Sequence, residues 1–129
     1  MSNKNLMIVS TLEDIIVSIK LILERFKDIK SVDDFLINDE NLKTLDSISM
    51  RLIAIGEGFK NIDKLSDKQL LIKYDSIEWQ GVKGIRDILS HHYFDLDSEI
   101  IFDICENKLD SLLEVSKEML EEKIGFGDF

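Results

Sequence analysis

The sequence predicts an all-α fold, an up-and-down four-helix bundle with short extra helices. The chain of 129 residues has no proline and only six glycines. An all-β fold would need many tight turns built from those two residue types. In addition, several long segments repeat apolar residues every three or four positions, which is typical of one buried helix face. The length suits a single domain over residues 1–129.

The first predicted helix runs from Ser10 to about Ile29. Ser10 and Glu13 have the spacing of a capping box, in which each side chain satisfies a free backbone donor at a helix start. The same spacing of Ser31 and Asp34 predicts a second helix start. The apolar stripe of the first helix consists of Leu12, Ile15, Ile16, Ile19, Ile22, Leu23 and Phe26.

A longer helix is predicted after the polar turn at residues 38–41. Gly56 and Gly58 lie inside it, although each glycine costs a helix about 1 kcal/mol relative to alanine. Glycines at such positions usually permit close approach of another backbone. The apolar stripe of this helix consists of Leu42, Leu45, Ile48, Leu52, Ile55, Phe59 and Ile62.

Three further helices complete the predicted bundle. A short one covers Ser66–Tyr74 with Ser66 as its cap, and another covers Trp79–Ser90. The last begins at Asp97 or Ser98 and buries a long apolar stripe. That stripe consists of Ile100, Ile101, Ile104, Leu109, Leu112, Leu113, Met119 and Leu120.

Composition excludes several classes of function. The net charge of −10 argues against a surface that holds nucleic acid all over, so no DNA binding is expected. The richest apolar stretch, 15–23, is interrupted by Ser18 and Lys20 and cannot span a bilayer, so we expect a cytoplasmic protein. The single cysteine, Cys105, cannot form an intrachain disulfide and is expected to be a buried, inert thiol.

The residues able to do chemistry gather in the window 79–93. It contains both histidines, the only tryptophan and one of the two tyrosines. A histidine can take the proton of a ribose 2′-hydroxyl or protonate a leaving oxygen, and an arginine can stabilise the charged transition state. No carboxylate cluster with metal-ligand spacing lies nearby. The pattern therefore suits metal-independent RNA cleavage without a cofactor.

The spacing within this window raises a geometric question. On an ideal helix Arg86 and Tyr93 share a face, whereas Arg86 and His91 point about 140° apart. Asp87 lies four residues before His91, within reach of a hydrogen bond that would orient the ring. Either the helix ends near Ser90 and the chain turns, or these groups meet those of a second copy.

A known family shares this pattern. The R-x-x-x-x-H-x-Y motif, filled as Arg86, His91 and Tyr93, resembles the HepT branch of the HEPN superfamily. The segment 55–57 (Ile-Gly-Glu) resembles the family's I-G-E segment on its second long helix. The segment 77–79 (Ile-Glu-Trp) resembles the family's approach to the motif.

The resemblance implies a specific activity and specific partners. Such proteins are helical bundles that form homodimers, whose paired motifs make one composite cleft that cleaves RNA, with transfer RNA as one expected substrate. Arg86 and His91 would be catalytic and Asp87 supporting. Tyr93 would be the residue modified by an MNT-type nucleotidyltransferase antitoxin. Many members have asparagine where this chain has Asp87, whose negative charge works against phosphate binding.

Two other functions compete with the ribonuclease hypothesis. The chain could be a non-catalytic helical partner of a nucleotidyltransferase that binds a nucleotide near Tyr93, or simply a dimerisation module. The acidic charge is unevenly distributed, because residues 73–93 hold three basic and three acidic side chains. An RNA cleft in this locally neutral window would bind weakly and depend strongly on salt.

Overall fold

The computed structural model describes residues 2–89 and 97–125 of the chain. These residues contain helices and no strand, which confirms the predicted all-α class. The elements in chain order are α1 (Asn3–Phe26), η1 (Val32–Leu36), α2 (Asp39–Leu65), η2 (Leu71–Lys73), α3 (Trp79–Lys83), α4 (Ile85–Leu89), α5 (Ser98–Asn107) and α6 (Leu109–Gly125).

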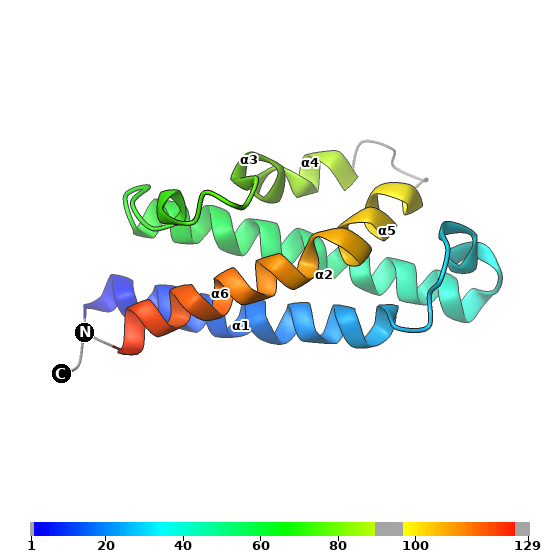
Figure 1. Ribbon diagram of the computed structural model, residues 1–129, viewed down its shortest axis with the longest axis horizontal. Helices are drawn as coiled ribbons and strands as arrows, with labels where there is room; N and C mark the ends of the chain where they lie inside the picture. Colours follow the sequence, from blue (N-terminus) through cyan, green and yellow to red (C-terminus); the bar gives the residue numbers. More distant parts are fainter. Residues whose placement is uncertain (1, 90–96, 126–129) are drawn as a thin grey trace.

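The helices form an up-and-down bundle (Figure 1). The first leg is α1, the second is α2, the third is the pair α3–α4 and the fourth is the pair α5–α6. Each leg runs antiparallel to the one before it, and α2 lies between α1 on one side and α3–α4 on the other. The predicted four-helix bundle is therefore present, with its third and fourth legs each divided into two helices.

The first helix begins earlier than predicted. Ser2 caps α1, because its side chain accepts a hydrogen bond of 3.1 Å from the backbone N–H of Asn5. The expected start at Ser10 is wrong: the buried Ile8 extends the apolar stripe one turn toward the N-terminus, and tertiary packing outweighs the local capping signal. The predicted start at Ser31 is confirmed, although the element it opens is the short 3₁₀ helix η1.

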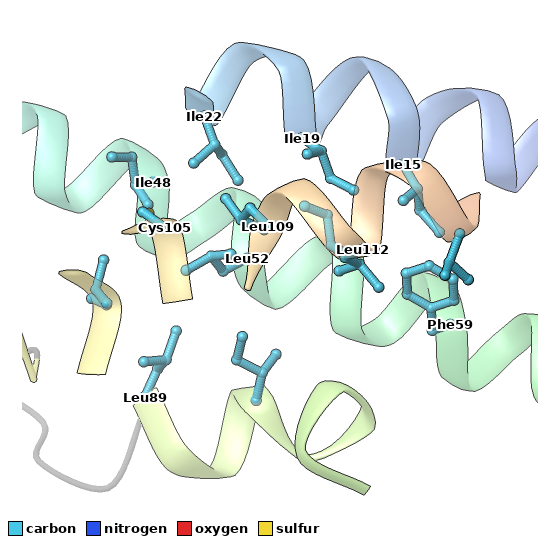
Figure 2. Close-up of a cluster of buried hydrophobic side chains, with 14 of the residues drawn as sticks. Ile15, Ile19, Ile22, Ile48, Leu52, Phe59, Leu89, Cys105, Leu109 and Leu112 are labelled. Carbon is cyan, nitrogen blue, oxygen red and sulfur yellow. The ribbon is translucent and has the colours of Figure 1, made fainter. Parts of the chain in front are cut away.

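The core lies between α1, α2 and α6 (Figure 2). Figure 2 shows Ile15 and Ile19 of α1 facing Leu52 of α2 and Leu112 of α6. Burying each such side chain stabilises the fold by about 1.5–3 kcal/mol. The predicted stripe of α2 is buried throughout apart from Leu42, which is 41% exposed near the start of that helix.

The segment after α2 differs from the prediction. Ser66 ends α2 rather than opening a new helix, and only Leu71–Lys73 form a short 3₁₀ helix. Asp67 and Lys68 have φ angles of 53° and 63°, in the left-handed region that L-residues rarely adopt. Lys68 then donates its backbone N–H to the carbonyl oxygen of Asp63 at 2.8 Å. The chain thus folds back on the end of α2, which the helical pattern did not reveal.

The third and fourth legs are divided where the sequence predicted continuous helices. Gly84 ends α3, so the helix predicted over Trp79–Ser90 is two short helices, with Ser90 outside the described residues. Asp97 caps α5 as predicted, accepting from the backbone N–H of Ile100 at 3.1 Å. Lys108 then separates α5 from α6. This break lets α5 pack on η1 and α2 while α6 packs on α1.

Two predictions about single features can be compared with the structure. Cys105 is buried, as predicted, and its burial raises the pKa of the thiol to about 12. In the part of the chain that the structure describes, no helix is both long enough and apolar enough to cross a membrane.

Candidate functional site

The helix α4 presents a set of exposed side chains beside the bundle. Ile85 and Leu89 are buried and anchor α4 to the core, and Figure 2 shows Leu89 within the apolar cluster. Arg86, Asp87 and Ile88 lie between these anchors and are exposed. The side chain of Arg86 is 66% accessible to solvent. The predicted catalytic arginine is therefore free to meet a large substrate or a second protein chain.

A glycine on α2 allows this third leg to lie close. A Cβ atom at Gly56 would lie 2.7 Å from the carbonyl oxygen of Val82, and closer still to Cγ2 of Ile85. Because real Cβ atoms do not approach other atoms so closely, any larger residue at position 56 would push α3 and α4 away. The prediction that another backbone approaches is confirmed at Gly56, whereas the atoms nearest a Cβ at Gly58 belong to the side chains of Ile15 and Thr11.

The residue after this glycine pairs with the candidate catalytic arginine. Oε1 of Glu57 lies 3.7 Å from Nη1 of Arg86. Both side chains are well exposed, so the pair contributes little to stability. The pair places the guanidinium of Arg86 next to a carboxylate of α2. The sequence marked Glu57 only as part of the Ile-Gly-Glu segment, and its contact with Arg86 on another helix was not predicted.

Aromatic packing fixes the start of the third leg. The ring of Trp79 lies 5.0 Å from that of Phe59, and its indole N–H donates a 2.9 Å hydrogen bond to the carbonyl oxygen of Tyr74. Tyr74 in turn donates to Glu122 of α6 at 3.1 Å. Burial, and then the Glu122 carboxylate, raises the pKa of Tyr74 to about 12. Trp79 is therefore partly buried and packs against the core.

A partly buried ion pair forms a second attachment of α3 to α2. Nζ of Lys83 lies 2.9 Å from Oδ2 of Asp63, with the two side chains 25% and 13% exposed. Removing one partner of such a pair leaves the other charge poorly solvated, so the pair favours one position of α3. The sequence gave no signal for it, because the two residues lie 20 positions apart on different helices.

Two cavities flank this leg. One, of about 620 Å³, is mainly apolar and lies between α2, α3–α4 and α5–α6, lined among others by Val82, Ile85, Ile88, Ile100 and Ile104. The other, of about 690 Å³, is open and polar. Its lining residues are Lys60, Asp63, Lys64, Asp67, Lys68, Gln80, Lys83, Gly84 and Asp87.

The remaining site residues fall outside the described ranges. His91 and Tyr93 belong to the segment 90–96, so their distances to Arg86 and Asp87 stay predictions. Within residues 2–89 and 97–125, no group of three or more His, Cys, Asp or Glu side chains is arranged to hold a metal ion. The structure brings Arg86 together with Glu57, and places Asp87 on the wall of the polar cavity.

The structure places the chain among the antiparallel helical bundles, with an exposed arginine on its divided third leg. Sequence comparison identifies the family. The model of the family "Ribonuclease HepT-like" matches residues 15–119. That match covers α2 to α5 completely, half of α1 and most of α6. The chain belongs to the HepT-like ribonuclease family of the HEPN superfamily.

Individual relatives agree with this family. The chain is 35% identical over 104 residues to "Putative RNase MJ0127" of Methanocaldococcus jannaschii. The aligned region covers 78% of this chain and 83% of that protein. It is 30% identical over 112 residues to "Putative RNase TTE0752" of Caldanaerobacter subterraneus. The aligned region covers 87% of this chain and 93% of that protein.

A third relative is a longer protein. "Gamma-glutamylcyclotransferase and putative RNase MJ0434" of Methanocaldococcus jannaschii is 33% identical over 112 residues, covering 86% of this chain but 46% of that protein. No solved structure matches the chain significantly.

Proposed function

We propose that this protein is a metal-independent endoribonuclease toxin that acts as a homodimer, with Arg86 and His91 as its catalytic residues. The observation that carries the proposal is the placement of Arg86 in a member of a ribonuclease family. Its guanidinium is exposed on α4, beside Glu57, on a leg that Gly56 allows to lie against α2.

The chemistry needs only these two side-chain types. His91 takes the proton of a ribose 2′-hydroxyl, and the 2′-oxygen attacks the adjacent phosphorus. The bond to the 5′-oxygen breaks, and that oxygen leaves after gaining a proton from a protonated histidine. Arg86 stabilises the extra negative charge on the phosphoryl oxygens through forked hydrogen bonds. The products are a 2′,3′-cyclic phosphate and a 5′-hydroxyl.

A homodimer would supply both groups to one phosphate. Ile88 is 42% exposed on α4, beside the apolar cavity of about 620 Å³. An exposed apolar side chain at the rim of an apolar cavity supports a protein partner at this face. Two copies that meet there would bring two Arg86 side chains to one interface.

We further propose that an MNT-type nucleotidyltransferase antitoxin silences the enzyme by modifying Tyr93. The net charge of −10 supports a partner with a basic surface. A nucleotidyl group on Tyr93 would add bulk and negative charge two residues from His91. Both effects would repel an RNA phosphate from the cleft.

The test is cleavage of total transfer RNA in excess EDTA by the parent protein and by its His91→Ala variant. Intact mass is recorded first, so that only protein without an added nucleotide is assayed. We expect cleavage by the parent alone, with products that end in a 2′,3′-cyclic phosphate. Size-exclusion chromatography with light scattering should give twice the chain mass of 14.9 kDa.

Two outcomes would overturn the proposal. Equal cleavage by the parent and by His91→Ala would remove His91 from the mechanism. If the unmodified, dimeric parent cleaves no RNA but binds ATP, the chain is instead a nucleotide-binding partner of a nucleotidyltransferase.

A further inference from the structure

The open polar cavity beside α4 differs in its balance of charged side chains from the chain as a whole. Of the 16 lysines and arginines in the sequence, four line this cavity, whereas only three of the 26 acidic residues do so. The cavity therefore holds one more basic than acidic side chain, whereas the whole chain has a net charge of −10.

The acidic side chains of the cavity do not cancel its lysines. Asp63 is buried and its carboxylate is already paired with Lys83 at 2.9 Å, so these two charges neutralise each other. Lys60, Lys64 and Lys68 are exposed, and no ion pair is formed by any of them with the residues that the structure describes. Their ammonium groups are available to an anionic ligand.

The backbone arranges these three lysines in a row. Lys60 and Lys64 lie one helical turn apart, about 6 Å along the axis of α2, and therefore share one face. Lys68 follows just after the helix, where the left-handed Asp67 and Lys68 fold the chain back on the end of α2. The three cations thus line a single wall of the cavity.

The opposite wall connects the cavity to the candidate catalytic arginine. It is formed by Gln80, Lys83, Gly84 and Asp87 of the third leg, and Asp87 directly follows Arg86. On α2, Glu57 pairs with Arg86 and lies one turn before Lys60. An extended polyanion that places one phosphate at Arg86 can therefore continue along the lysine row.

We infer that this cavity binds the RNA backbone next to the cleaved phosphate, with Lys60 and Lys64 as substrate-positioning residues. The inference rests on the proposed function and adds a subsite to it. Lysines act on phosphates as point charges and release counterions when the phosphates bind. The row therefore contributes affinity that is independent of RNA sequence and falls as salt rises.

The experiment measures RNA binding and RNA cleavage separately. A fluorescently labelled single-stranded RNA with 2′-O-methyl groups, which cannot be cleaved, reports the Kd by anisotropy at several salt concentrations. The test variant is Lys60→Gln with Lys64→Gln. The control is Lys20→Gln with Lys43→Gln, which removes the same charge from exposed helix positions elsewhere. Glutamine keeps the helix propensity of lysine, so all variants should fold.

We expect the test variant to bind on the order of tenfold more weakly at about 0.15 M salt, and the control to match the parent. Loss of two phosphate contacts should reduce the slope of log Kd against log salt by about 1.4. In the cleavage assay the KM should rise while kcat stays within about twofold. Asp67→Asn removes a negative charge from the same cavity, so it should tighten binding by about two- to threefold.

The two proposals can fail separately. If the test and control variants bind RNA equally, the subsite is wrong, whatever the cleavage assay shows. If the parent binds RNA through these lysines but does not cleave it in EDTA, the subsite holds and the proposed ribonuclease chemistry is wrong. A parent that shows no salt-dependent RNA binding overturns the subsite.

Discussion

The three long helices and the third leg of this bundle are held in different ways. Helices α1, α2 and α6 each bury a wide apolar stripe, and α1 packs along both α2 and α6. By contrast, α3 has no buried residue, and α4 buries only Ile85 and Leu89. The leg that carries Arg86 packs against α2 but contributes only these two side chains to the buried core.

Because of this difference, the residues that stabilise the bundle are largely distinct from those that position Arg86. The core of the long helices is distributed over many side chains, so it tolerates the loss of any single surface contact. The position of Arg86 depends on the space left by Gly56, the Trp79–Phe59 packing and the Lys83–Asp63 pair. A local change in the third leg should therefore abolish activity while the bundle remains folded.

The largest effect is expected for Arg86→Ala. Removing a donor to the charged transition state should lower kcat by about 10²–10³-fold. Because Arg86 is exposed and its pair with Glu57 is weak, the free energy of unfolding should change by less than about 0.5 kcal/mol. Cleavage rates and urea unfolding of the same sample measure both quantities.

Arg25→Ala is the matched control for this prediction. Arg25 is also an exposed helix arginine, and it donates to Ser47 rather than to any group near α4. This control should keep full activity. An Arg86→Ala variant that cleaves RNA at the parental rate would show that the third leg is not the catalytic region.

An intermediate effect is expected where the third leg meets α2. Gly56→Ala forces the backbone at Val82 and the side chain of Ile85 to move, which should cost about 1–3 kcal/mol of stability. Activity should fall further than this loss of stability explains, because Arg86 moves with α4. Thermal unfolding and cleavage at a temperature well below the Tm separate the two effects.

Gly81→Ala offers the contrasting substitution. A Cβ at Gly81 meets nothing within 4 Å, and the residue lies inside α3. Alanine there should leave activity unchanged and stabilise the helix by up to about 1 kcal/mol. If Gly56→Ala proved as harmless as Gly81→Ala, close packing of α4 on α2 would not position the arginine.

The smallest effect concerns the core and appears at alkaline pH. The thiol of Cys105 has an ordinary pKa of 9.0, and burial raises this pKa to about 12 in the folded protein. Above pH 9 the unfolded chain loses the thiol proton while the folded chain keeps it, so the free energy of unfolding should decrease as pH rises toward 12. Tyr74, with its pKa raised to about 12, should add to this decrease above pH 10.

Urea unfolding at pH 8, 9 and 10 tests this dependence. Cys105→Ala should have a flatter pH dependence than the parent over this range, and at pH 8 it should still cleave RNA, since Cys105 lies in α5 and not in the third leg. A parent whose stability does not change between pH 8 and pH 10 would contradict the assigned burial of the thiol.

Sequence reasoning succeeded where the signal is periodic, and it was less reliable for single capping patterns and helix breaks. The apolar stripes of the first, second and last predicted helices together contain most of the residues that form the core. The start at Ser10 was wrong because a capping pattern inside a helix is overruled by buried neighbours such as Ile8. The divisions at Gly84 and Lys108 were missed because single residues within a periodic pattern carry little signal.

For the candidate site, the sequence identified residue types but not their partners. The window around Arg86 was recognised because it concentrates residues able to do chemistry, and the family comparison agrees with that reading. The contact of Glu57 with Arg86 and the Lys83–Asp63 pair join different helices. Their formation depends on how those helices dock.

The sequence by itself determined that the chain is helical and which faces of its long helices are buried, and it predicted a ribonuclease-type motif at Arg86, His91 and Tyr93. Apolar periodicity and motif spacing involve residues that are close together in the chain, so both can be recognised from the sequence alone. Only the tertiary structure decided which helix supports Arg86 and that three lysines line a cavity beside it. These are juxtapositions of residues on different elements, and they arise from the close packing that Gly56 permits.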